Sequence, residues 1–373
     1  MQRRYLGLIL LAFLAVSLGL WLGRTQLLAR YYVYRLARVD AADRDAWIIR
    51  AVNLDDAAVP ALVECLTQND ERACDNITTT IQNLMGRWGL DDTRAAALSI
   101  RLADAFPAMS VAGQELVLRL EHGWLSRPEK DGHRNDQVFH NAARLLSQVA
   151  RVDNPVVRSQ ALALADHLLP EIASDPVILK ACRELAQVGL HDVEIDNRVH
   201  AIRLAQVPKL NLLTEVVPCL RDPSSAVRRA AILALGPSPD AINDDTLFYW
   251  LSDPDPEVRQ LCEVALRGRG LQDHHIRLAR LMADPRPTVR MEVLETIDQA
   301  PDLDPGVWLR RLSHDPSPAV RAATARAAAT QTQVDLSDRI DQMAQTDPSP
   351  TVQQVARYYL SCQRLRADQS ERP

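Results

Sequence analysis

A cluster of histidines and carboxylates in the first half of the chain has the residue types of a metal site. Its members are His122, His133 and His140 with Glu121, Asp131 and Asp136. Imidazole nitrogens and carboxylate oxygens bind divalent metals, but metal motifs place their ligands at short, characteristic separations. The histidines here are 11 and 7 residues apart, which matches no such pattern. The sequence therefore favours solvated loop histidines, and we expect no metal ion and no cofactor.

A joint metal site at His274 and His275 is not expected either, because adjacent residues do not share one face of a helix. Nucleophilic chemistry has no better support. Neither a G-x-S-x-G elbow, nor a P-loop, nor an H-E-x-x-H motif occurs. The cysteines contain no C-x-x-C pair, so we expect buried free thiols; they are Cys65, Cys74, Cys182, Cys219, Cys262 and Cys362. The sequence thus predicts no catalytic residue and a protein that is not an enzyme.

The residues that do recur at a fixed spacing are an aspartate and an arginine six positions later. Residues 314–329 read HDPSPAVRAATARAAA, and similar segments occur at 221–236, 252–267, 283–298 and 346–361. A fixed period in this range indicates stacked copies of one supersecondary unit. The five aspartates lie 31, 31, 31 and 32 residues apart; they are Asp222, Asp253, Asp284, Asp315 and Asp347.

Two helices per repeat are needed to position this motif. Apolar residues at helical spacing precede each aspartate, in the segments 210–220, 244–251, 273–282, 306–312 and 336–344. Four copies place a proline at the predicted start of the second helix, where its missing N–H costs nothing; these are Pro256, Pro287, Pro318 and Pro350. Ser224, Asp255, Ser317 and Ser349 are predicted N-caps of that helix, whereas Arg286 is a poor cap. The alanines that follow predict close packing between units.

This pattern resembles the HEAT-repeat family, in particular the short bacterial repeats related to those of phycobilin lyases. The resemblance implies an all-α fold, a HEAT-like α-solenoid superhelix. It also implies a structural ladder in which the aspartate and arginine of adjacent units are hydrogen-bonded. The implied ladder residues are Asp222, Arg228, Asp253, Arg259, Asp284, Arg290, Asp315 and Arg321. In the last copy Gln353 replaces the arginine, which suits a terminal unit.

The motif is regular over 210–363, predicted to hold five repeats, and degenerate over 46–209. Asn154 to Arg158 looks like a sixth copy, and amphipathic patterns bring the total to about nine antiparallel helix pairs. Residues 127–136 are predicted to form a polar connector, and residues 364–373 a disordered tail. Only 5% of the residues are aromatic, which also favours helices over strands.

The N-terminus has the pattern of a membrane anchor. After a tail of residues 1–4, residues 5–23 carry no charge, and a helix of that length would span about 28 Å, close to the thickness of a bilayer core. The alternative is a cleaved signal peptide ending at Ala15-Val16-Ser17, but the apolar run continues beyond that site. Gly19 and Gly23 would allow weak dimerisation, although glycine is common in membrane helices generally.

Residues 24–45 are predicted to form a juxtamembrane amphipathic helix, either touching lipid headgroups or packing as a stalk on the first repeat. A tail that holds Arg3 and Arg4 is hard to translocate. We therefore expect a single-pass membrane protein with its repeats on the extracytoplasmic side.

These features predict a membrane-anchored scaffold that binds a protein partner through its solenoid surface. One alternative is an enzyme or enzyme accessory, by analogy with phycobilin lyases. A second is a nucleic-acid binder like the HEAT-like alkylpurine glycosylases. The net charge of -5 opposes that second alternative, because phosphate contacts supply most of the affinity for nucleic acid. The sequence does not identify the partner.

Overall fold

The computed structural model describes residues 23–40, 42–89, 92–126, 136–169, 175–297, 304–331 and 334–370. Every regular element in these ranges is a helix and none is a strand, which confirms the all-α prediction for this part of the chain. The chain divides into two compact units between Val216 and Val217, close to the predicted boundary at 209/210.

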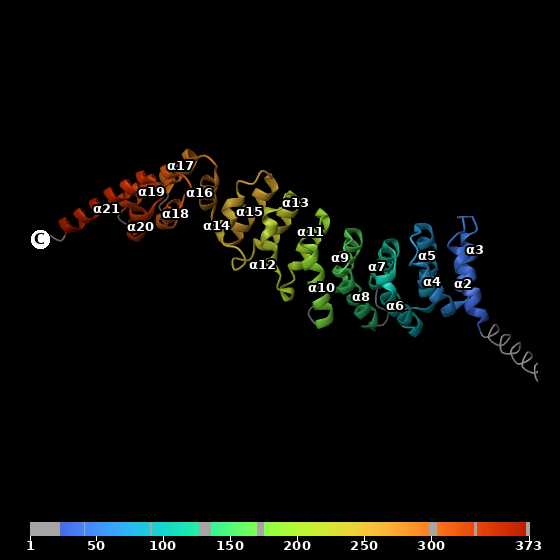
Figure 1. Ribbon diagram of the computed structural model, residues 1–373. Coiled ribbons are helices and arrows are strands. Elements are labelled where there is room, and N and C mark those ends of the chain that lie inside the picture. Colours follow the sequence, from blue (N-terminus) through green and yellow to red (C-terminus); the bar gives the residue numbers. More distant parts are fainter. Residues whose placement is uncertain are drawn as a thin grey trace, which may run out of the picture. The chain divides into compact units, whose positions relative to one another are not determined.

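The first unit consists of short helices joined by tight turns (Figure 1). Each helix packs against its neighbours in sequence and one or two elements further on, as in a repeat stack. The elements are α2 (Arg24–Leu36), α3 (Arg44–Val52), η1 (Asp55–Ala58), α4 (Val59–Cys65), α5 (Glu71–Trp88), α6 (Thr93–Ala105), η2 (Phe106–Ala108), α7 (Val111–Leu125), α8 (Asp136–Val149), α9 (Pro155–Leu168), α10 (Pro176–Gly189), α11 (Ile195–Ala205), η4 (Pro208–Leu210) and α12 (Leu213–Val216).

The second unit holds the regular repeats, and here α13 packs on α15, α17 on α19, and α19 on α21. The elements are η5 (Val217–Arg221), α13 (Ser225–Leu235), α14 (Asp244–Trp250), α15 (Pro256–Gly268), α16 (Asp273–Ala283), α17 (Pro287–Ile297), α18 (Pro305–Leu312), α19 (Pro318–Thr330), α20 (Ser337–Thr346) and α21 (Pro350–Ser370). The predicted prolines therefore begin α15, α17, α19 and α21. Buried Ala325 and Ala328 of α19 join the apolar core with α20 and α21, as the alanine pattern predicts.

Two stretches differ from the sequence-based expectation. The first helix predicted at 210–220 is divided into η4, α12 and η5. Asn211 has a left-handed backbone and ends η4, and Pro218 lacks the N–H that would continue α12 as an α-helix. The tail predicted to be disordered from residue 364 instead continues helix α21 through Ser370. No glycine or proline interrupts the chain between Pro350 and Ser370, so nothing in the backbone stops the helix earlier.

The predicted anchor at 5–23 and its Gly19 lie outside the described residues, apart from Gly23, which precedes α2. Within the described ranges, no helix combines the length and the apolar character needed to cross a bilayer. Most of the predicted connector, 127–135, also lies outside the described residues, and Asp136 begins α8.

One glycine marks a close approach between helices in the first unit. A Cβ atom added to Gly113 of α7 would lie 2.4 Å from the backbone oxygen of Leu66. Ser110, the N-cap of α7, donates to that same oxygen through its backbone N–H and its hydroxyl. The turn after α4 and the start of α7 are therefore held in contact at a point where no side chain fits.

Gly113→Ala is expected to destabilise the chain by about 1 to 3 kcal/mol, because the opposing group is backbone and cannot rotate away. Gly123→Ala in the same helix is the matched control. A Cβ atom there meets nothing within 4 Å, so alanine is expected to stabilise α7 by up to about 1 kcal/mol. Urea unfolding of the full chain measures both changes, and equal effects would contradict the close approach.

Candidate functional site

The motif aspartate of every regular repeat shapes the turn between its two helices. In each case Oδ1 accepts a hydrogen bond from the backbone N–H two residues later, at 2.7 to 2.8 Å. The aspartates are Asp222, Asp253, Asp284, Asp315 and Asp347. The predicted caps Ser224 and Ser317 make no side-chain cap bond, because the preceding aspartate already orders the turn through their N–H groups. Asp255 does cap α15.

The motif arginine links its own turn to the turn of the next repeat. Its Nη1 donates to two backbone oxygens of its own turn, while Nε and Nη2 donate to both carboxylate oxygens of the next aspartate. This bidentate geometry suits the planar guanidinium. The pairs are Arg228–Asp253 at 2.8 and 2.9 Å, Arg290–Asp315 at 2.6 and 2.8 Å, and Arg321–Asp347 at 2.8 Å twice.

These three ion pairs, which we call rungs, are shielded from water. The side chains of Asp253, Asp315 and Asp347 are 1%, 5% and 3% exposed. The hydrogen bond from Arg321 lowers the pKa of the Asp347 carboxyl. Asp347 was recognised as a motif aspartate but was not among the implied ladder residues, and it receives the last rung.

One rung implied by the resemblance is missing. Arg259 donates to the backbone oxygens of Asp253 and Pro254, but no carboxylate partner for it is found in the described residues. Its expected partner Asp284 is held within its own turn by Arg286, at 3.0 Å for both contacts. Hydrogen bonds from Arg286 lower the pKa of Asp284 to about 2. Arg286, which the sequence marks as a poor N-cap, thus forms an ion pair with the carboxylate that the family resemblance assigns to the ladder.

A further rung occurs in the first unit, where the motif is degenerate. Arg158 forms a buried ion pair with Asp192, and Nη1 of Arg198 donates to the backbone oxygens of Asp192 and Val193 at 2.8 and 3.1 Å. Asp192 and Arg198 therefore form the same turn as the regular repeats, without its proline. Their six-residue separation was the available signal, and sequence analysis missed it.

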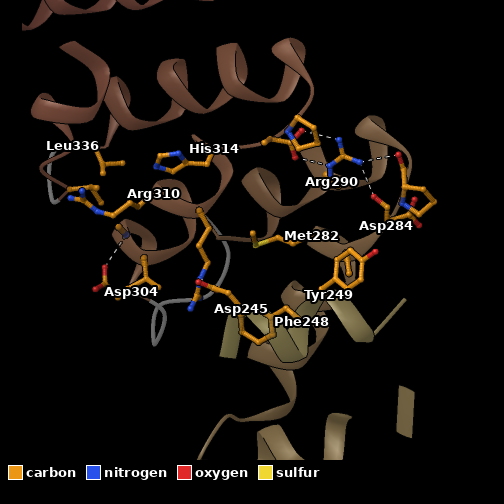
Figure 2. Close-up of a pocket in the computed structure, with 18 of the residues that line it drawn as sticks. Asp245, Phe248, Tyr249, Met282, Asp284, Arg290, Asp304, Arg310, His314 and Leu336 are labelled. Carbon is orange, nitrogen blue, oxygen red and sulfur yellow. Dashed lines mark hydrogen bonds and ion pairs between the residues drawn. The ribbon is translucent and has the colours of Figure 1, made fainter. Parts of the chain in front are cut away.

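A groove of about 1200 Å³ opens in the second unit beside the missing rung. Its lining comes from α14, the end of α16, α18, and the turns around Asp284, Asp315 and Leu336. Figure 2 shows Met282 between Tyr249 on one side and Arg310 on the other, with His314 above. The rung of Arg290 and its neighbouring turn at Asp284 border the groove at one end.

An aromatic stack fixes the groove wall. Phe248 of α14 stacks on Trp308 of α18 with ring centroids 5.8 Å apart, and Trp308 also lies parallel to His275 of α16 at 6.4 Å. Arg311 lies 4.9 Å from the Phe248 ring centroid and forms a 2.6 Å ion pair with Asp245. The first helices of three consecutive repeats are thereby tied together.

Other groups in the groove remain available to a ligand. Tyr249 is 67% exposed and Val307 is 43% exposed. The Arg310 guanidinium has no hydrogen bond or ion pair to any described residue, and Arg310 is exposed. Burial, with Arg339 and Arg310 nearby, lowers the pKa of His314, so its ring is neutral at physiological pH. The groove thus offers apolar and aromatic surface next to an exposed guanidinium, whose charge also acts on the nearby carboxyl of Asp335.

The described histidines of the cluster have other neighbours. The rings of His122 and His167 of α9 are tilted, with centroids 4.3 Å apart, while His140 pairs with Asp175 at 2.9 Å. His133 and Asp131 lie outside the described residues. In the ranges that the structure describes, no group of three or more metal-binding side chains is found.

The cysteines lie in places that disfavour nucleophilic chemistry. All except the half-buried Cys362 are buried. Burial raises the pKa of the Cys65 thiol to about 11 and those of Cys182 and Cys262 to about 12. Thiols with such pKa values are protonated at physiological pH, and the thiolate is the reactive form.

The turns, the rungs and the helix pairs agree with a comparison against known families. Residues 213–297 match the family model of HEAT repeats. The match spans three motif aspartates, including the one at the missing rung, and it supports assigning these repeats to the HEAT-repeat family. No curated protein matches the chain. A solved structure of an engineered protein is 16% identical over 90% of this chain and 94% of its own, with a TM-score of 0.31, and no inference is drawn from it.

Proposed function

We propose that this chain is a non-catalytic HEAT-type scaffold that binds a protein partner in the groove of its second unit. The observation that carries the proposal is the combination of exposed Tyr249 and Val307 with the exposed guanidinium of Arg310, which has no hydrogen bond to any described residue, in one concave surface. Tyrosine and arginine are enriched among the residues that dominate protein interfaces. Stacked repeats supply extended concave surfaces for such contacts.

The groove fits a protein segment better than a compact small molecule. Its walls are apolar and aromatic at Phe248, Met282 and Leu336. Most of its charged groups are engaged in turns, caps or pairs, and the hydrogen-bond donors of the Arg310 guanidinium are exposed. A segment that places apolar side chains against Tyr249 and an oxygen acceptor on Arg310 would satisfy both. The aromatic stack keeps this surface in shape before binding, which reduces the entropic cost of association.

The same contacts argue against the alternative functions. The guanidinium groups of Arg228, Arg290 and Arg321 are engaged by carboxylates and carbonyls, so they are not available for the phosphates of a nucleic acid. The buried, protonated thiols give no support to an enzyme of the phycobilin-lyase-like type.

We also propose that residues 5–23 hold the scaffold at a membrane as a single-pass anchor, with the repeats on the extracytoplasmic side. The support is the length of the uncharged stretch and the two arginines that precede it. An anchor of this kind raises the effective concentration of the groove for partners in the same membrane.

Crosslinking in native membranes, followed by mass spectrometry of what co-purifies with the tagged full-length chain, tests the proposal. A reproducible stoichiometric protein partner is expected, and its compartment reports which side the repeats face. Tyr249→Ser combined with Arg310→Ala is expected to reduce its recovery at least tenfold, because both removed groups contact the partner.

Tyr358→Ser is the matched control, since Tyr358 is 61% exposed in the same unit but does not line the groove. Recovery of the partner should be unchanged in that variant. A partner retained by the groove variant would move binding to another surface. A retained pigment, lipid or nucleic acid without a protein partner would exclude the scaffold function.

A further inference from the structure

Helix α2 presents two opposite faces of different character. Ala29, Val33 and Leu36 are buried, where α2 packs against α3, α4 and α5. The opposite face carries Leu27, Tyr31 and Tyr34, which are 54%, 52% and 55% exposed. Their spacing of four and three residues places them in one line along the helix. The stalk therefore packs on the repeats and still leaves an apolar and aromatic stripe uncovered.

Arginines flank this stripe, and no acidic residue occurs in α2. Arg38 lies 3.8 Å from the Tyr34 ring centroid, and Arg35 lies 5.2 Å from the ring of Trp47 in α3. These contacts orient the guanidinium groups without neutralising them. Among the arginines of residues 24–38, only Arg30 has a carboxylate partner in the described residues, an exposed contact with Glu64 at 3.7 Å. The stripe is therefore flanked by arginines, most of which have no carboxylate partner in the described residues.

We propose that the stripe of Leu27, Tyr31 and Tyr34 binds the surface of a membrane rich in anionic lipid, with the flanking arginines on the headgroups. Two observations select this occupant. Tyrosines and leucines beside arginines on one helix face have the composition of interfacial helices. The uncharged stretch of residues 5–23 ends at Gly23, directly before α2, so a bilayer that holds this stretch also lies within reach of the stripe.

The inference rests on the proposed membrane attachment and adds an orientation to it. With its outer face on the lipid, α2 lies along the membrane surface rather than standing on it. Because the inner face of α2 packs on α3, α4 and α5, the first helices of the repeat stack are held at the headgroup level. The anchor alone would leave them free to move away.

Spin labels on the full-length chain test this orientation. Leu27→Cys, Tyr31→Cys and Tyr34→Cys are made in a Cys362→Ser background, in which the remaining native cysteines are buried. Each labelled protein is reconstituted into vesicles of phosphatidylcholine with and without phosphatidylglycerol. Relaxation by lipid-soluble oxygen and by a water-soluble nickel complex is then compared. Val193→Cys is the control, since Val193 is a 79% exposed residue of the same unit.

All three stripe positions are expected to be several-fold more accessible to oxygen than to nickel, with a larger ratio when phosphatidylglycerol is present, while position 193 reports water. Nickel access equal to that at position 193, or lipid contact that fades from position 27 to position 34, would overturn the proposal even if the chain stays bound to vesicles. Shielding from both probes would assign the stripe to a protein contact. Failure to bind vesicles at all would instead refute the membrane attachment.

Discussion

Arg290→Ala is expected to destabilise the chain by about 3 to 5 kcal/mol, because it leaves the buried carboxylate of Asp315 without its partner. The substitution also removes the donor to the backbone oxygens of Asp284 and Pro285. Arg290 is only 7% exposed, so the wild-type contacts are largely shielded from water. Urea unfolding of the full chain, followed by circular dichroism, measures the change.

Arg259→Ala is the matched control, because Arg259 occupies the same motif position but has only the two carbonyl contacts. Its loss is expected to cost about 1 kcal/mol, as for ordinary hydrogen bonds at a half-buried site. A uniform ladder, as the sequence resemblance implies, would give equal costs at both positions. Equal costs would therefore contradict the missing rung, and negligible costs at both would refute the ladder itself.

Glu121→Gln is expected to remove the loss of stability that this one carboxyl causes as pH rises from 4.5 towards 8. Glu121 is fully buried, Oε1 accepts a 2.5 Å hydrogen bond from Ser99, and Oε2 has no partner among the described residues. Burial raises the pKa of its carboxyl from 4.5 to about 8. The folded chain therefore keeps a proton that the unfolded chain releases between these two values.

The direction of the pH dependence of stability follows from this difference in bound protons. Stability contributed by protonated Glu121 is complete below pH 4.5 and falls by about 1.4 kcal/mol per pH unit until pH approaches 8. Glutamine mimics the protonated form at every pH. The stability of the variant relative to the wild type therefore increases as pH rises. Urea titrations between pH 5 and 8 measure the difference in slope.

Glu64→Gln serves as the control for this titration, since Glu64 is 65% exposed and its replacement should leave the slope unchanged. If the wild type and Glu121→Gln show parallel pH profiles, the buried carboxyl is not protonated in the folded chain. Ser99→Ala should raise the pKa further, because the hydrogen bond from Ser99 is the contact that lowers it.

The helix pairs of the second unit could be predicted because their signals are local. An aspartate, a proline and apolar residues at helical spacing all act within one turn and its flanking helices, and Pro256 and Pro318 begin helices as expected. The break at Pro218 could have been predicted on the same grounds. The pairing of Arg with the next Asp came from family resemblance, since a contact across 25 residues has no local signature.

Side-chain contacts that the repeat pattern does not encode explain what sequence analysis missed. Arg286 forms an ion pair with Asp284, two residues before it, whereas the sequence identified Arg286 only as a poor N-cap. Asp192 receives a rung although its turn has no proline. Glu121 entered the sequence analysis only as a member of the histidine cluster, yet its side chain is fully buried and accepts a hydrogen bond from Ser99 of α6. The groove depends on side chains from three repeats meeting in space, and no single segment contains that information.

Each repeat in a stack contacts only its neighbours, so the stack bends at the junctions between repeats, and each rung stiffens one junction. Guanidinium groups join α13 to the turn before α15, α17 to the turn before α19, and α19 to the turn before α21. None joins α15 to the turn before α17 among the described residues, so this joint lacks a crosslink that its neighbours have. We expect the unit to bend most easily there on the side of its second helices, while the aromatic stack of α14, α16 and α18 holds the side of its first helices. Because the turn at Asp284 also borders the groove, such bending is expected to alter the groove at that end while its aromatic wall stays in place.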